Sequence, residues 1–155
     1  ITQYRILLYY NKKNRCKFTP VFLIVILACL TFCVFIQKLI QNTPNCIFIS
    51  IHQNHFSESK YNGTQVFYSK NHEDSKAIAE DIQNQVVTFI QPENKREIKP
   101  ATESIYLLWN TNVPAVLVEC GFLSNPSEAQ LLKDVSYQDK MAFSIFCGIL
   151  KYMSQ

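Results

Sequence analysis

The chain has 155 residues, of which 48% are hydrophobic and 17% are charged, values typical of about one globular domain rather than a disordered chain. Its net charge of +3 is unevenly divided, because the first 57 residues carry six basic and no acidic side chains while the rest has a net charge of −3. The basic residues stand beside an apolar segment, not on a folded face with aromatics between them. The pattern therefore argues against nucleic-acid binding and suggests association with a membrane.

Residues 18–36 form an uncharged apolar stretch, close to the roughly 20 residues that a helix needs to cross a bilayer. Basic residues precede it, so the positive-inside rule leaves the N-terminus in the cytoplasm and the rest of the chain outside. We therefore expect a basic segment at 1–17, a transmembrane or signal-anchor helix at 18–37, and an extracytoplasmic domain at 38–155 that is membrane-anchored or exported. The alternative is that this segment is not native coding sequence, since the chain starts at Ile1 and its composition changes abruptly.

Two strands and a helix are predicted at the start of the domain. Residues 46–52 form a short apolar run bounded by turn residues, which is typical of a buried strand and ends at His52. A polar stretch then leads through the turn signal Asn62-Gly63 to a second strand at 64–69. From residue 73 to residue 90 the apolar positions recur every three or four residues, which predicts an amphipathic helix packed on the sheet.

Two further strands follow a loop. Residues 91–102 are charged and contain two prolines, and this loop is long enough to be functional or mobile. A third strand is predicted at 105–109. Residues 113–118 are apolar on both faces, as expected of a strand inside a parallel sheet, and the run stops at Glu119. The predicted fold is α/β: a twisted, mainly parallel sheet flanked by helices, with an apolar helix at its N-terminal side.

The chain is predicted to end in two helices. Asn125 is a good N-cap, with proline at the first helical position and Glu128 at the third. Ser136 and Asp139 have the spacing of a capping box at the start of the last helix. Its apolar stripe is expected to contain Met141, Ala142, Ile145, Phe146, Ile149 and Leu150.

His52 and Glu119 are the residues best placed for chemistry. In open α/β sheets the reactive groups gather at the carboxyl ends of strands, so we expect the two side by side. Neutral imidazole binds Zn²⁺, and a free carboxylate can take a proton from a metal-bound water, which suits a metal hydrolase. The pattern alone is weak, because a hydrogen-bonded histidine or an ion-paired glutamate is commoner at such a position.

The remaining histidines and the cysteines give no metal site. His55 and His72 lie among polar residues and are expected to be solvated. The six cysteines show neither a C-x-x-C pair nor zinc-finger spacing, and most are explained as small buried hydrophobic residues rather than as a disulfide framework.

Three motifs resemble, in order and spacing, the zinc-dependent N-acetylmuramoyl-L-alanine amidases of bacterial cell walls. They are FISIHQN at 48–54, GTQVFY at 63–68 and PAVLVECGFLSN at 114–125. The match extends from about residue 38 to the C-terminus. Residues 99–110 and 137–142 look most like the spore-cortex, germination-related subgroup of spore-forming Gram-positive bacteria.

The resemblance implies a zinc ion held by two histidines and one glutamate, with peptidoglycan as the substrate. His52 matches the later of the two histidine ligands, and Glu119 matches the acid that acts as catalytic base. The implied reaction is hydrolysis of the amide between the lactyl group of N-acetylmuramic acid and L-alanine. The motif positions implied to bind substrate are Asn54, Gly63, Gln65, Leu123 and Asn125.

The chain also departs from the family pattern. In the family a first strand ends in an Asp-Pro-Gly-His-Gly type of loop that supplies the first histidine, and a glutamate ligand follows. Here no acidic residue precedes Glu58 and no histidine precedes His52. One ligand of three cannot hold a zinc ion usefully, so we expect the C-terminal two-thirds of an amidase domain, inactive as it stands. The alternative is a membrane-tethered protein that binds peptidoglycan without catalysis.

Overall fold

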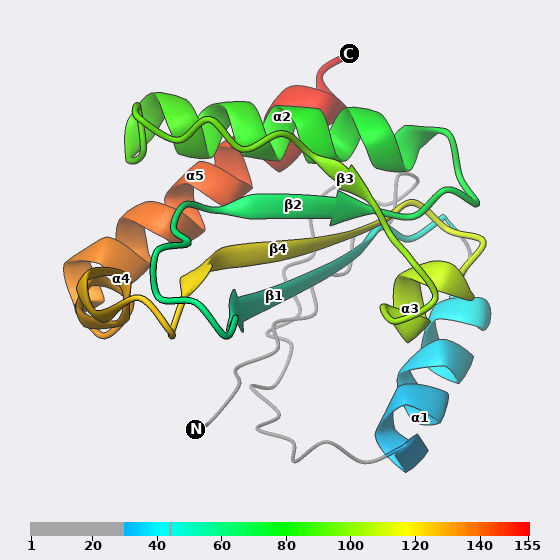
Figure 1. Ribbon diagram of the computed structural model, residues 1–155. Coiled ribbons are helices and arrows are strands. Elements are labelled where there is room, and N and C mark those ends of the chain that lie inside the picture. Colours follow the sequence, from blue (N-terminus) through cyan, green and yellow to red (C-terminus); the bar gives the residue numbers. More distant parts are fainter. Residues whose placement is uncertain (1–29, 44) are drawn as a thin grey trace.

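The computed structural model describes residues 30–43 and 45–155. Figure 1 shows four strands layered between helices. In chain order the elements are α1 (Leu30–Gln41), β1 (Phe48–Asn54), β2 (Gln65–Tyr68), α2 (Asp74–Phe89), β3 (Lys99–Pro100), α3 (Tyr106–Trp109), β4 (Ala115–Phe122), α4 (Pro126–Leu131) and α5 (Val135–Met153).

The strands form one mixed sheet in the order β1-β4-β2-β3. β1 pairs with β4 in parallel and β2 pairs with β3 in parallel, whereas β2 and β4 run antiparallel. The predicted α/β sheet flanked by helices is therefore confirmed, with an antiparallel pairing at its centre.

The side chains of β4 alternate between two apolar clusters. Val116 and Val118 point to the cluster formed with α2 and α5, while Ala115 and Leu117 point to the cluster formed with α1 and α3. On the first face α2 and α5 are in close contact: a Cβ atom added at Gly148 would lie 2.5 Å from the Cα atom of Ile82. On the second face α1 and α3 cover only the end of the sheet at which β1 and β4 begin (Figure 1).

Most of the expected transmembrane helix at 18–37 lies outside the described residues. α1 begins at Leu30 and continues to Gln41, beyond the predicted limit, and it buries Ile36 and Ile40 in the cluster shared with α3. Within residues 30–43 and 45–155, no helix combines the length and apolar character that a membrane span requires.

The strand predicted at 105–109 is wrong, since Tyr106–Trp109 form the short helix α3. Two successive residues, Leu107 and Leu108, are both buried in the cluster with α1, and a strand would have sent them to opposite faces. A short apolar run does not distinguish the two structures by its pattern. The fourth strand of the sheet is instead β3, which lies inside the predicted loop and ends at Pro100 on an edge that tolerates proline.

The remaining boundaries agree with the prediction only in part. β4 does not stop at Glu119 but continues to Phe122. The Asn125 cap of α4 is confirmed, because its side chain accepts hydrogen bonds from the N–H groups of Ser127 and Glu128. The cap of α5 is Asp134 rather than Ser136. The buried stripe of that helix consists of Met141, Ser144, Ile145, Gly148 and Ile149, which leaves Ala142, Phe146 and Leu150 exposed.

Candidate active site

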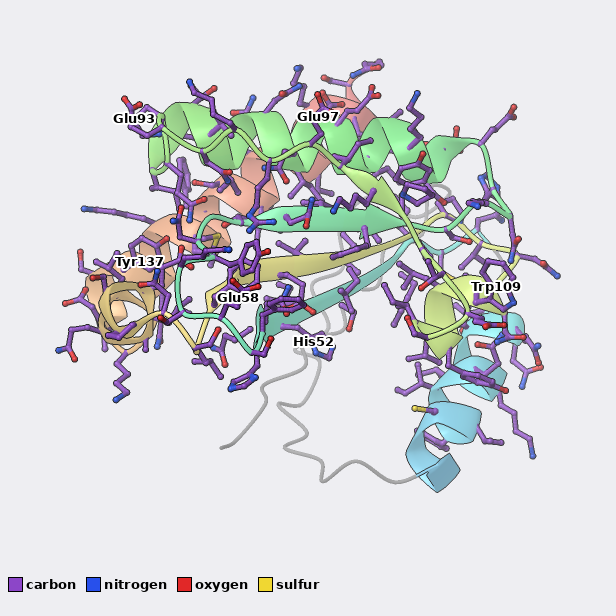
Figure 2. The ribbon with its side chains drawn as sticks, viewed as in Figure 1. His52, Glu58, Glu93, Glu97, Trp109 and Tyr137 are labelled. Atoms are coloured by element: carbon purple, nitrogen blue, oxygen red, sulfur yellow. The ribbon has the colours of Figure 1, made fainter. Side chains whose placement is uncertain are left out.

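Three of the predicted site residues lie in one row across the sheet. Glu119 of β4 is the register partner of His52 on one side and of Gln65 on the other, so the three side chains point to the same face. This is the face of Ala115 and Leu117, beyond the part that α1 and α3 cover. In Figure 2, His52 lies well away from Trp109 of α3.

The carboxyl of Glu119 is perturbed by its burial. Its Oε2 atom is buried and has no hydrogen-bond partner within the described part of the chain. Burial raises the pKa of this carboxyl from 4.5 to about 7, because an anion loses its hydration there. A carboxyl that is partly ionised near neutral pH can both accept and return a proton, which is what a general acid–base catalyst requires.

His52 is held against the sheet beside Glu119. Its Nε2 atom lies 2.8 Å from the hydroxyl of Ser50, two residues earlier on the same face of β1. Across residues 30–43 and 45–155, no three His, Cys, Asp or Glu side chains come close enough together to hold a metal ion. The side chains around His52 and Glu119 therefore do not fit the three-ligand zinc site that the sequence resemblance implies.

A β-bulge in β4 follows Glu119 directly. From the pair of His52 with Glu119 to the pair of Asn54 with Phe122, β1 advances by two residues and β4 by three. The extra residue turns the Phe122 side chain to the face of Glu119, where strict alternation would have put it on the other face. Bulges of this kind re-aim side chains next to active sites.

Phe122, Tyr61 and Arg96 form a wall next to this row. The Arg96 guanidinium carbon is 4.6 Å from the ring centre of Phe122 and 5.8 Å from that of Tyr61. Its Nε atom donates to the Asn62 carbonyl, and its Nη1 atom donates to Gln65 Oε1 at 3.2 Å. The sequence predicts only that residues 91–102 form a loop long enough to be functional or mobile. This loop contacts Gln65 through the Arg96 side chain and through the Glu97 carbonyl, which accepts from Gln65 Nε2 at 2.9 Å.

Glu128 ties the bulge to the turn before β2. This buried carboxylate accepts the N–H of Gly63 at 2.9 Å and the N–H of Phe122 at 2.7 Å. The approach favours a glycine at 121, since a Cβ atom there would lie 3.1 Å from Glu128 Oε1 and the carboxylate would have to shift. The sequence places Glu128 only in the first turn of a helix. It carries no signal for this role, because Gly63 is far away along the chain and Phe122 belongs to another element.

The other four predicted substrate-binding positions surround the bulge. Asn54 Oδ1 accepts the N–H of His55, and the Asn54 carbonyl accepts the N–H of Leu123. Gly63 has a φ of 87°, and a Cβ atom there would lie 2.7 Å from Asn94 Oδ1, so the turn requires glycine. Asn125 caps α4. Each residue thus shapes the backbone near Glu119, and contact with substrate stays a prediction for all of them.

The other two histidines and the cysteines of the described residues lie outside this arrangement. His55 is exposed as expected. His72 is half-buried, with its Nδ1 atom 3.8 Å from Asp74. The four cysteines within the described residues are unpaired. Burial, with a further contribution from the charge of Glu119, raises the pKa of the Cys120 thiol to about 12, which keeps it protonated and unreactive.

Comparisons with known proteins agree with this architecture. Residues 35–151 match the family model described as N-acetylmuramoyl-L-alanine amidase. The germination-specific N-acetylmuramoyl-L-alanine amidase of Bacillus subtilis is 40% identical over 118 residues, which cover 76% of this chain and 49% of that protein. The chain thus spans about half the length of this curated relative.

Solved structures show the same likeness. The CwlD amidase from Clostridioides difficile, determined in complex with the GerS lipoprotein, has a TM-score of 0.72 and 47% identity, over 76% of this chain and 59% of that one. An N-acetylmuramoyl-L-alanine amidase from Clostridium difficile 630 has a TM-score of 0.72 and 30% identity, over 79% and 66%. The match to the family model and these relatives confirm the resemblance found in the sequence, and the chain belongs to the N-acetylmuramoyl-L-alanine amidase family.

Proposed function

We propose that this chain supplies the proton-transferring carboxyl of an N-acetylmuramoyl-L-alanine amidase site, and that the site acts on peptidoglycan outside the cell membrane. The substrate bond is the amide between the lactyl group of N-acetylmuramic acid and L-alanine. The observation that carries the proposal is Glu119 itself, a carboxyl with a buried oxygen that has no hydrogen-bond partner in the described chain and lies in register with His52. Family membership supports the choice of substrate.

Glu119 would move one proton in two steps. As a water oxygen bonds to the amide carbon, the ionised carboxyl accepts a proton from that water. When the carbon–nitrogen bond breaks, the same carboxyl returns the proton to the leaving nitrogen of L-alanine. A pKa near 7 suits both steps, because the two protonation states are then of similar energy at neutral pH.

The ligand count supports the proposal that this chain does not turn over substrate on its own. His52 is the candidate metal ligand beside Glu119, and no group of three ligands forms within the described residues. In the segment at 1–29 the sequence has no His, Asp or Glu, and its residues of a metal-ligating type are Cys16 and Cys29. We therefore assign no catalytic step to a metal here.

The same shortage of ligands favours a second candidate function, a peptidoglycan-binding protein without catalysis. The aromatic and arginine wall beside Glu119 does not depend on a metal. In this case the chain would bind the glycopeptide and leave the amide intact. For either function, tethering of the chain to the membrane by residues 18–37 stays a prediction.

One experiment separates these possibilities. Purified chain, the Glu119→Gln variant and the control Glu93→Gln are incubated with isolated peptidoglycan, with and without added zinc chloride. Co-sedimentation measures binding, and mass spectrometry measures released stem peptides. We expect all three proteins to bind and none to release peptide. Release that is lost only in Glu119→Gln would show a working amidase, and a failure of all three to bind would reject both functions.

A further inference from the structure

The Arg96 guanidinium is held rigidly beside the site by contacts from three segments. It lies over the ring of Phe122 at the end of β4 and near the ring of Tyr61 in the loop before β2. Two of its N–H groups donate to the Asn62 carbonyl and to Gln65 Oε1. An arginine that stacks on aromatic rings and is fixed by two hydrogen bonds is pre-organised, so little side-chain entropy remains to be lost when a ligand binds.

The charge on Arg96 is not neutralised within the described part of the chain. No carboxylate of residues 30–43 or 45–155 forms an ion pair with it. The neighbouring cation, Lys60, is already paired with Glu58 at 2.6 Å. Guanidinium has five N–H donors, and those that Asn62 and Gln65 do not use can form the paired, charge-assisted hydrogen bonds that a carboxylate accepts.

Arg96 also lies at a distance from Glu119 that a short peptide could span. Gln65, whose side chain it contacts at 3.2 Å, is the direct cross-strand partner of Glu119, and such partners have Cβ atoms about 5 Å apart. The guanidinium is therefore about one side chain away from the reacting amide. Because successive residues of a peptide are about 3.8 Å apart, this separation matches a group one or two residues beyond that amide.

We propose that Arg96 is a specificity-determining residue that binds a free carboxylate of the stem peptide within two residues of the amide next to Glu119. The assignment rests on the proposed function, since it takes peptidoglycan as the ligand. Phe122 and Tyr61 hold the guanidinium in position, and Gln65 links it to the row that contains Glu119. The site therefore selects an acidic peptide over one whose carboxylates have been converted to amides.

The test uses two probes that differ only in charge: N-acetylmuramoyl-L-alanyl-D-glutamate and the same compound with both carboxylates as amides. Binding of each to the full chain is measured by titration calorimetry. The wild-type chain is expected to prefer the acid by roughly ten-fold or more, as charge-assisted hydrogen bonds typically give. Arg96→Gln should lower the affinity for the acid to about the affinity for the diamide, and Arg96→Lys should restore part of the preference.

A matched control removes the same charge from the same loop. Lys95 is exposed, so Lys95→Gln should retain the full preference for the acid. Equal binding of the two probes by the wild-type chain would overturn the inference, as would a variant at Arg96 that loses affinity for both probes equally, since that result indicates a purely structural role. Failure of the wild-type chain to bind either probe would instead reject the proposed function together with the inference.

Discussion

Glu119 differs from the other acidic residues that are drawn into the interior of the described chain. Asp81 is buried but forms an ion pair with Lys151 at 2.9 Å, and Glu128 is buried with a backbone N–H on each oxygen. In both, the ion pair or the hydrogen bonds replace the interactions with water that burial removes. Glu119 leaves one buried oxygen without such compensation in the described chain, a cost that the proposed proton-transfer role would explain.

This cost predicts a pH-dependent stability. The folded-state pKa of Glu119 is about 7 against 4.5 for an ordinary glutamate, so the folded state binds this proton more tightly than the unfolded state. Stability is unaffected below pH 4.5, falls as pH rises to 7, and is fully reduced above pH 7. At about 1.4 kcal/mol for each unit between the two pKa values, the loss is about 3 kcal/mol as an upper value, since Glu119 is partly exposed.

Glu119→Gln should remove this dependence because its side chain does not ionise. Urea unfolding between pH 4 and pH 8 is the measurement. The variant and the wild-type chain are expected to be about equally stable at pH 4, and the variant more stable by about 1–3 kcal/mol at pH 8. Glu93→Gln, at an exposed position, serves as control and should follow the wild-type curve. A variant that is less stable than the wild-type chain at pH 8 would contradict the assigned cause.

For helices and strands, the sequence pattern predicted the structure where an element depends on its own residues rather than on distant contacts. The periodicity at 73–90 and the Asn125 cap correspond to α2 and α4. The run at 105–109 failed because its burial depends on α1, more than sixty residues away. That His52 lies beside Glu119 could be predicted, because each was expected at the end of a strand. The positions of Arg96 and Glu128 could not, because they depend on the bulge and on hydrogen bonds between residues far apart in the sequence.

The identity of the N-cap of α5 can be checked directly by mutation. The side chain of Asp134 accepts the N–H of Tyr137 at 2.9 Å, whereas Ser136, the cap expected from sequence, lies inside the helix. Asp134→Ala should lower the free energy of unfolding by about 1 kcal/mol, measured by urea unfolding. Ser136→Ala should change it by less than about 0.5 kcal/mol. The reverse order of the two effects would indicate that the helix begins two residues later than described.

For the molecule as a whole, the position of β1 in the sheet is the exceptional feature. β1 is an edge strand within the described residues, yet its seven residues include no proline and no Lys, Arg, Asp or Glu. Edge strands usually carry such residues as protection against pairing with another chain. The pattern at β1 resembles that of an interior strand, and the beginning of the strand is nearly inaccessible: Ile49 is 1% exposed.

Hydrogen exchange can test this arrangement residue by residue. The Phe48 N–H bonds to the Pro114 carbonyl, and the register with β4 is parallel, so the amides of Ser50 and His52 also point to β4. The amides of Ile49, Ile51 and Gln53 point to the open edge. Measured by NMR under native conditions, these three should exchange roughly ten times faster or more than those of Ser50 and His52, and the β4 amides before the bulge should be slow. Uniform protection along β1 would contradict the open edge, because it would require another segment to pair with that side of the strand.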